Sequence, residues 1–458
     1  MVNCKLTIAA FSLLTSFSAW ASGFSLYEPS VISHAMGGAL VGKAMDASAN
    51  FNNPATLTDL TNAQITVGFV TEHPRCQVRG DMNGRHWGDE CLDPGLFWLP
   101  HFQLALPLPA GFTFGFAGDA EYGLGTLYSD KWPLAWNSTE TTVQGYVLNP
   151  NLAYRITDKW SVGVGLRWLF FDFEQYSRPS ANGLGTLETR LKGNNRWQSV
   201  GFQIGTKYDF TDDFSVGLVY KSPIKVTVKG KIETSVEGYD DRMIGNYASA
   251  LVQEQLGGMG FLPGMPGYST AFAKAQGTAI GSIRQGIRDS ARLHNGAAEA
   301  ELSLPQSVSL GCNWDVTKTW HLGAAISWTE WSVIDTLNFR LAGGDKDVDL
   351  DWHDTWRLSV GSCWEFARDW KWMISYTFDQ DSTSTDQTST MLPPAHRHIA
   401  ATGFAWEVGW GVELALSYSC IFMDGLGMDT HDTFGNSYHL ETCRGFCHAA
   451  GFSVTYRF

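Results

Sequence analysis

Two groups of acidic and imidazole side chains have spacings that could hold a metal ion. The first is a run of alternating carboxylates, which are ligands that Ca²⁺ takes, at Asp345, Asp347, Asp349 and Asp351. A solvated acidic loop explains the same run, and the second group, His396 and His398, resembles a metal-binding pair only superficially. No Ser-His-acid set stands out for nucleophilic catalysis. We therefore expect no metal, no cofactor and no enzymatic activity.

The cysteines are the other reactive side chains. Cys76 and Cys91 bracket a polar segment and are the preferred disulfide pair. Zinc binding by this pair is the weaker alternative, because no His/Cys partner set has ligand spacing. Cys443 and Cys447 are a second candidate pair, and an odd thiol is left over once Cys4 is set aside.

The N-terminus predicts export. Lys5 precedes an apolar core over residues 6–14, and Ala19-Trp20-Ala21 is a small-x-small cleavage site. This is the pattern of a signal peptide over residues 1–21, with Ser22 as the first mature residue. The apolar core is shorter than the ~20 residues that a membrane-spanning helix needs. The mature cysteines are then expected in an oxidising compartment.

The composition is typical of a membrane β-barrel. The chain has 19 Trp, 27 Phe, 15 Tyr and 48 Gly but only 17% charged residues, and no later apolar run reaches 18 residues. The strands of a barrel hide their apolarity by alternation, which explains this combination. The net charge of -14 argues against binding to nucleic acid, which needs a basic surface.

Alternation of apolar and small or polar residues is clearest at the C-terminus, where Phe446, Phe452 and Tyr456 share one face and Cys447 and Ser453 the other. A period of two is what a strand between lipid and lumen requires. The same pattern predicts about 14 strands, near 63–72, 97–107, 110–119, 140–156, 159–175, 194–210, 213–230, 300–314, 319–338, 352–366, 369–380, 391–407, 410–424 and 446–458. Short turns follow the even-numbered strands and longer loops the odd-numbered ones. This parity predicts a closed antiparallel barrel, residues 63–458, with both termini in the periplasm.

Two kinds of segment lie outside the strand pattern. Residues 22–62 are too short for an independent domain and are expected to fold into the lumen as a plug. Long external loops are expected near 119–139 and 231–299. Within the second we predict helices at residues 247–256 and 271–293, joined by an exposed stretch that contains Met and Phe.

Several motifs in this order resemble the FadL family of outer-membrane transporters for hydrophobic compounds, over nearly the whole mature chain. The N-terminal motifs are Ser22-Gly23-Phe24-Ser25-Leu26 and Asn53-Pro54-Ala55. The later ones are Trp98-Leu99-Pro100, Tyr122-Gly123-Leu124, Ala153-Tyr154-Arg155, Leu302-Ser303-Leu304-Pro305, Trp328-x-x-Trp331, Asp354-Thr355-Trp356-Arg357 and Leu392-Pro393-x-x-x-Arg397. Pro394-Ala395-His396 departs from the family, which often has an acidic residue there, and this leaves the substrate open.

The resemblance implies a monomeric, plugged 14-stranded barrel in the outer membrane of a Gram-negative bacterium, surrounded by lipid and lipopolysaccharide. It implies capture of a hydrophobic molecule in an external groove, transfer to an internal pocket at the plug, and lateral release through the wall. Long-chain fatty acids are the expected cargo and aromatic hydrocarbons the alternative. A surface adhesin or receptor is a further alternative, whereas a general diffusion porin conflicts with the 22–62 segment.

Candidate site residues follow from this reading. Gly23, Phe24, Ser25 and Leu26 would form the gate, whereas Asn53, Pro54 and Ala55 are expected to turn the chain from plug to first strand. The outer groove would be lined by Leu124, Leu127, Trp132 and Trp136, with Phe261, Leu262 and Met265 opposite, although ordinary loop packing is an equal alternative. Inward-facing Arg167, Arg357 and Lys371 could attract a carboxylate, or could simply pair with acidic residues in a solvated lumen.

Overall fold

The computed structural model describes residues 23–293, 295–341, 344–383, 390, 392, 395–431 and 435–458. The predicted signal peptide, residues 1–21, and the predicted mature start at Ser22 lie outside the described residues. No helix in these ranges is long and apolar enough to cross a membrane.

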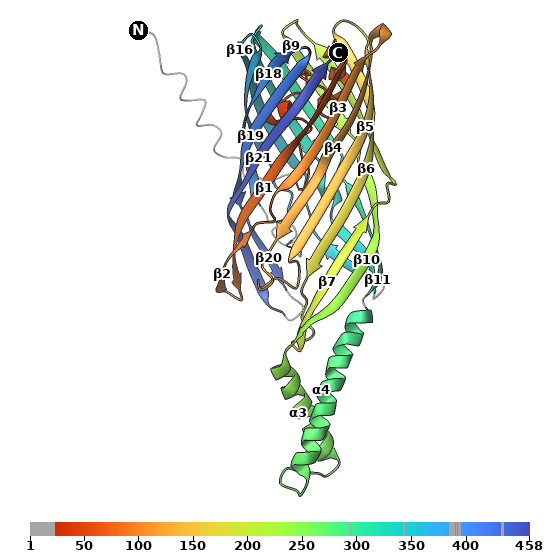
Figure 1. Ribbon diagram of the computed structural model, residues 1–458, viewed down its shortest axis with the longest axis vertical. Coiled ribbons are helices and arrows are strands. Elements are labelled where there is room, and N and C mark those ends of the chain that lie inside the picture. The colour runs from red at the N-terminus through yellow and green to blue at the C-terminus, as the bar shows by residue number, and fades with distance from the viewer. Residues whose placement is uncertain are drawn as a thin grey trace, which may run out of the picture.

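The described strands form a closed antiparallel barrel of 14 strands, as the alternation predicts (Figure 1). The barrel closes where the first strand pairs with the last, from Gln64↔Arg457 onward. In wall order the strands are β1 (Gln64–Met82), β3 (Phe97–Pro107), β4 (Phe112–Leu127), β5 (Glu140–Arg155), β6 (Trp160–Ser177), β8 (Ser199–Asp209), β9 (Phe214–Lys221), β12 (Ser307–Thr317), β13 (Trp320–Thr329), β16 (Thr355–Ala367), β17 (Trp370–Asp379), β18 (Ala395–Gly409), β19 (Val412–Gly425) and β21 (Ser437–Arg457).

Additional strands extend the wall at the end that carries the long loops. They are β2 (Arg85–Leu92), β7 (Gly185–Asn194), β10 (Ile224–Tyr239), β11 (Gly296–Leu304), β14 (Thr336–Leu341), β15 (Lys346–Asp349) and β20 (Gly427–His431). β1 and β4 are longer than predicted, because β1 continues into a hairpin with β2 and β4 continues to Leu127. The first part of the predicted loop at 119–139, up to Leu127, is therefore strand.

Side chains alternate across the wall as the sequence predicts. On β21, Phe446, Phe452 and Tyr456 are exposed on the outer face, whereas Cys447 and Ser453 are buried on the inner one. Exposed tryptophans open strands directly after short turns, at Trp160, Trp320 and Trp370. Their rings are placed for an interfacial girdle at that end of the barrel.

Both predicted disulfides are absent from the structure, which has free thiols at all four positions. Cys76 pairs in register with Leu92, and Cys91 pairs with Gln77. Adjacent residues point to opposite faces of a strand, so Cys76 and Cys91 point away from each other. Cys443 and Cys447 both lie on β21, where four residues span about 13 Å, well beyond the reach of a disulfide.

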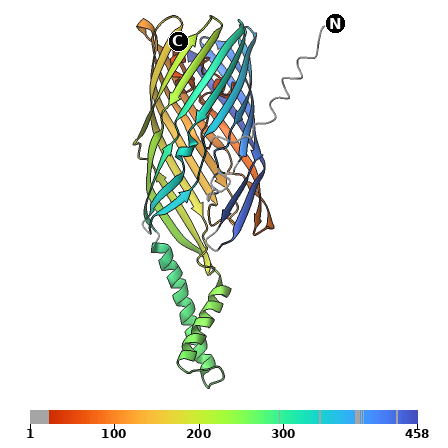
Figure 2. The ribbon, with the colours of Figure 1, turned by 180° about the vertical axis from the view of Figure 1, so that it is seen from behind.

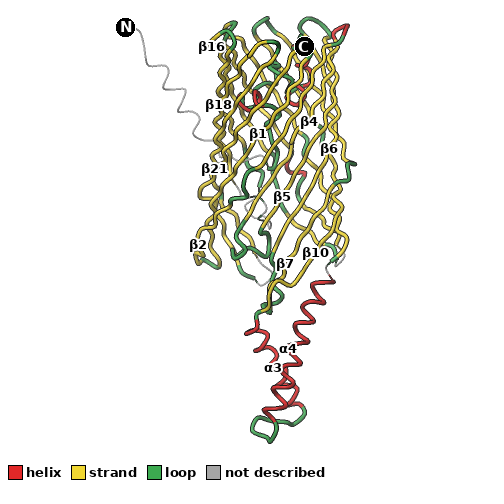
Figure 3. The backbone as a smooth tube through the Cα atoms, viewed as in Figure 1, coloured by secondary structure: helices red, strands yellow, loops and turns green. Residues whose placement is uncertain are grey.

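The N-terminal part, residues 23–62, lies inside the barrel, and we call it the luminal segment (Figure 3). It contains α1 (Val31–Ala35), α2 (Ala49–Asn52) and a 3-10 helix, η1 (Pro54–Asp59). Ser30 caps α1, and His34 on the same helix lies 2.9 Å from Ser417 and 2.8 Å from Ser419 of β19. Short 3-10 turns also occur in the wall at η2 (Pro109–Gly111) and η3 (Trp331–Val333).

Inward-facing glycines make room for the luminal segment. A Cβ atom added to Gly217 of β9 would lie 2.0 Å from the carbonyl oxygen of Val41, and one on Gly323 of β13 would lie 2.1 Å from that of Ala39. Real Cβ atoms do not approach backbone so closely, so only glycine permits this contact. Much of the glycine content of the strands is explained by this close approach.

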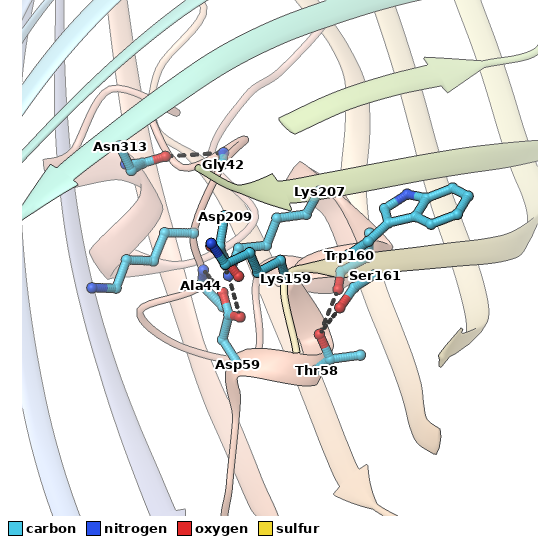
Figure 4. Close-up of polar contacts among 12 residues, drawn as sticks. Gly42, Ala44, Thr58, Asp59, Lys159, Trp160, Ser161, Lys207, Asp209 and Asn313 are labelled. Atoms are coloured by element: carbon cyan, nitrogen blue, oxygen red, sulfur yellow. Dashed lines mark hydrogen bonds and ion pairs between the residues drawn. The ribbon is translucent and has the colours of Figure 1, made fainter. Parts of the chain in front are cut away.

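Polar contacts fix the luminal segment near the short-turn end of the barrel (Figure 4). The Asp59 carboxylate pairs with the Lys207 ammonium, and Thr58 donates a hydrogen bond to Ser161 at 2.8 Å. The Asn53 amide donates to the carbonyl of Val41 at 2.8 Å and to that of Thr206 at 3.1 Å. Asn53-Pro54-Ala55 therefore sits at a buried turn that joins the segment to the wall.

At the opposite end a helical hairpin projects beyond the barrel (Figures 1 and 2). Its helices, α3 (Asp241–Gly258) and α4 (Tyr268–Leu293), confirm the two predicted helices with longer bounds. Ile244, Ala248 and Val252 of α3 are buried in the hairpin, as is Ile287 of α4. An α-helix as long as α4 spans roughly 39 Å, so its tip is far from the lumen.

Candidate functional site

The start of the luminal segment, residues 23–28, adds to the edge of β4. Ser25 pairs with Tyr122, flanked by hydrogen bonds of 2.9 Å from Leu26 N–H to the carbonyl of Glu121 and from Gly123 N–H to that of Phe24. Gly23 has a φ of +45°, and a Cβ there would lie 2.6 Å from the Trp331 ring. The segment is therefore placed both by strand pairing and by an aromatic wall.

This edge of β4 is free because β3 leaves it. β3 pairs with β4 only from Phe102↔Gly118 to Pro107↔Thr113. Beyond that point β4 keeps its pairing with β5 on the other side, as far as Leu127↔Glu140. The wall is thus interrupted between β3 and β4, and the ring of Phe97 on β3 lies against Gly125 of β4, with 2.0 Å from its nearest atom to an ideal Cβ position there.

An apolar cavity lies on one side of residues 23–28. Phe24 forms part of its lining, with Leu124, Val143, Phe171 and Trp352. The Phe24 ring meets those of Trp331 and Trp352 edge-on, with centroids 5.0 and 5.9 Å apart. The lining is almost wholly aliphatic and aromatic, so this cavity suits a hydrocarbon.

A larger cavity extends from Ser25 and Leu26 to Trp98 and Leu99 of β3. We call it the wall cavity, because it reaches the interruption between β3 and β4. It shares Leu124, Val143 and Leu392 with the apolar cavity. These three side chains therefore separate the apolar cavity from the wall cavity.

A third cavity is polar and rich in cations. It is lined by Ser25 and Tyr27 of the luminal segment and by Arg167, Lys221 and Arg357 of the wall. We call it the cationic cavity. Residues 23–28 therefore lie where an apolar cavity, a cationic cavity and a wall opening meet.

The three predicted lumen cations have different partners. Arg167 pairs with Glu121 and donates hydrogen bonds of 3.1 Å to Tyr122 and to the carbonyl of Ser222. Arg357 donates to the carbonyl of Gly37 at 3.2 Å and stacks over the Tyr27 ring at 4.2 Å.

Lys371 lies elsewhere, paired with Glu413 at 3.2 Å and with Glu407 at 3.7 Å. For Lys371, as for Arg167, pairing with acidic residues of the lumen, the alternative to attracting a carboxylate, accounts for the contacts.

Sequence reasoning missed Lys221 as a site residue. Its ammonium lies 3.2 Å from the centroid of the Phe51 ring, and no salt bridge to it occurs in the described ranges. The signal was present, because Lys221 continues the inward face of Ser215 and Gly217 on β9. The same alternation that places Arg167 and Arg357 on the inner face therefore also places Lys221 there.

The predicted outer groove is only partly assembled. Leu124 lines both the apolar and the wall cavities. Trp132 is buried in a separate cluster with Tyr128, its ring stacked at 3.8 Å, and Trp136 packs against the same cluster. Leu127 is exposed beside it.

The prediction that Phe261, Leu262 and Met265 face this groove is wrong. They lie in the turn between α3 and α4, at the far tip of the hairpin (Figure 1). Alternation could not reveal that the two helices carry this turn away from the barrel.

The whole chain resembles known outer-membrane proteins. It is 23% identical over 445 residues to the long-chain fatty acid transport protein of Escherichia coli O6:H1, covering 90% of each chain. A Pseudomonas aeruginosa FadL homologue of known structure has a TM-score of 0.76 at 18% identity, covering 95% of this chain and 100% of that one. The toluene transporter TodX of P. putida has a TM-score of 0.63 at 14% identity, covering 96% and 99%.

A family model described as outer membrane protein transport protein (OMPP1/FadL/TodX) matches residues 12–458. The chain therefore belongs to the OMPP1/FadL/TodX family and is an outer-membrane β-barrel transporter of hydrophobic compounds.

Proposed function

We propose that this chain takes up long-chain fatty acids and that residues 23–28 are its gate. The observation that carries the proposal is the position of these residues, where the apolar cavity, the cationic cavity and the wall opening meet. In this proposal the chain is a monomer that performs no chemistry on its cargo. The long-loop end faces the cell exterior among lipopolysaccharide, and both termini face the periplasm.

The apolar cavity would hold the hydrocarbon tail. Each buried CH₂ group gains about 0.8 kcal/mol on leaving water, so a cavity lined by Phe24, Phe171 and Trp352 favours a long chain. A water-filled bore would remove this gain. A tail held here needs an exit that is also apolar.

The wall opening between β3 and β4 would be that exit. Displacement of Leu124 and of the Ser25-Leu26 strand would join the apolar and wall cavities, which share this wall. The cargo would then leave past Phe97 and Trp98 toward the lipid face, where Trp98 is exposed. Lateral release keeps the tail out of water throughout.

The cationic cavity would hold a carboxylate head group. Arg167 is already neutralised by Glu121, and Arg357 is engaged with backbone and with Tyr27. Lys221, by contrast, forms no salt bridge among the described residues: its ammonium lies over the Phe51 ring, and the Glu121 and Asp119 carboxylates act on it only from a longer distance. We therefore assign the head group to Lys221, with Arg357 beside it.

The substitution Lys221→Met is expected to lower uptake of labelled oleate by about tenfold, the effect of losing one charge-assisted contact of ~1.4 kcal/mol. Uptake of labelled toluene should not change, because toluene has no anionic group. Initial uptake by cells that express the chain measures both. Lys225→Met, at an exposed lysine on β10, is the matched control.

Three outcomes would redirect the proposal. Toluene uptake without oleate uptake would favour aromatic hydrocarbons as the cargo. An equal loss of both compounds in Lys221→Met would assign Lys221 a structural role. Absence of uptake of either compound by the wild type would overturn the proposed function.

The projecting hairpin favours a second candidate function, a surface receptor or adhesin. Its tip exposes Met259, Leu262 and Met265, and exposed apolar groups of this kind often mark a contact site. Because the hairpin lines none of the three cavities, transport should not need it.

Replacement of residues 241–293 by a short Gly/Ser linker is expected to leave oleate uptake within about twofold of the wild type, since local loop changes rarely affect a packed wall. Uptake and cell adhesion are measured on the same cells. Loss of adhesion with uptake retained would support the second candidate, and loss of uptake would place the hairpin in the transport path.

A further inference from the structure

The wall cavity is lined by carboxyl groups at the point where cargo would leave. Glu28 comes from the luminal segment, Glu72 from β1, Asp379 from the end of β17, and Asp381 from the residues just after it. Among the described residues of its lining, Arg397 is the one cation. This cavity is therefore acidic, whereas the cavity that contains Arg167, Lys221 and Arg357 is cationic.

The single positive charge of Arg397 can balance only one of these four carboxyl groups. Its guanidinium donates a hydrogen bond of 2.8 Å to the carbonyl of Gly23, and its distance to the Asp379 carboxylate is 3.9 Å. Asp381 accepts hydrogen bonds from Thr383 at 2.8 and 3.2 Å rather than from a cation. The acidic groups therefore outnumber the positive charge that faces them.

The surroundings disfavour negative charge. Burial raises the pKa of Asp381 to about 7. Burial also raises the pKa of Glu28 above its ordinary value, even though Arg357 and Arg397 act in the opposite direction. An environment that penalises the charge on its own carboxyl groups penalises that of an anionic cargo in the same way.

We propose that the wall cavity passes cargo only in uncharged form, and that Glu28 and Glu72 are the residues that reject anions. This rests on the proposed function, because it assigns a selectivity to its exit. A neutral hydrocarbon or alcohol crosses unhindered. A fatty acid held as a carboxylate at Lys221 crosses after taking a proton from water, so that a neutral acid enters the bilayer.

Two probes of equal chain length test this selectivity without relying on titration of the cargo. They are labelled 1-dodecanol, which is neutral, and dodecane-1-sulfonate, which stays anionic, both below micellar concentration. Initial uptake is measured in cells that express the full chain and in cells that lack it. The wild type is expected to take up the alcohol at least about tenfold faster than the sulfonate, because a poorly hydrated cavity disfavours an anion that has no cationic partner.

The double variant Glu28→Gln with Glu72→Gln is expected to raise the sulfonate-to-alcohol uptake ratio by about tenfold, because it removes the negative charge that the pair retains and offers amide N–H donors to the sulfonate. Glu72→Gln alone, which leaves the luminal segment unchanged, should raise it by a smaller factor. Glu188→Gln, at an exposed residue of β7, is the control and should keep the wild-type ratio.

Equal uptake of both probes by the wild type, or an unchanged ratio in both Gln variants, would overturn the inference and leave the transport function standing. Failure of the wild type to take up even the alcohol would instead contradict the transport function.

Discussion

Oxidation of a chain that carries Ser25→Cys and Tyr122→Cys is expected to stop oleate uptake, and a reductant is expected to restore it. Ser25 and Tyr122 face each other between two flanking backbone hydrogen bonds. This is the close, non-hydrogen-bonded type of antiparallel pair, with Cα atoms about 4.5 Å apart, which is within disulfide range. The bond would lock the gate against β4, so that the apolar and wall cavities could not join.

The expected loss is about tenfold or more, since a covalent lock leaves no open population. Initial uptake is measured before and after oxidation, and bond formation is followed by mass spectrometry. Each single cysteine variant, treated in the same way, controls for loss of the Tyr122 ring. Full uptake by the oxidised double variant would show that residues 23–28 need not move, and the gate would have to be sought elsewhere.

The substitution Gly217→Val is expected to displace the luminal segment while the barrel still folds. Its new Cβ would lie 2.0 Å from the backbone oxygen of Val41 and 2.8 Å from the Asn53 amide. Backbone cannot give way as a flexible side chain can, so the segment must leave this position. We expect permeability to large water-soluble antibiotics to rise by about tenfold, because a barrel of this size encloses an aqueous channel once it is empty.

Gly238→Val is the matched control. Gly238 lies on β10, and no heavy atom is within 4 Å of a Cβ placed there. Antibiotic sensitivity and the amount of heat-modifiable, folded barrel are measured for both variants. Unchanged permeability of folded Gly217→Val protein would mean that the segment tolerates a side chain there, and the glycine contacts would not be what seats it.

The strands could be predicted because the alternation of side chains along each strand indicates which of its faces meets lipid and which meets the lumen. On β21 the alternation of Phe446 with Cys447 separates lipid from lumen without knowledge of any neighbour. The parity of short and long connections then requires closure on an even count. The patterns that predicted helices α3 and α4 were likewise local, although both helices are longer than predicted.

Features that depend on relations between distant strands could not be predicted. The break between β3 and β4 is a property of their pairing, and nothing at Phe97 or Gly125 alone announces it. The cysteine pairings failed because strand register decides which way Cys76 and Cys91 point. Glu28 and Asp381 both line the wall cavity although they are far apart in the chain, and no sequence spacing reveals that they share this lining.

The bare inner positions of the wall have a consequence for chimeric proteins. At Gly163, Gly217 and Gly323 the strand surface is complementary in shape to the backbone of the luminal segment that packs on it. A relative with a bulkier residue at one of these places must thread its own N-terminal residues along another course. Grafting residues 23–62 onto such a host should therefore fail unless the matching glycines are transferred too, because the segment and the wall positions that it touches fit only as a set.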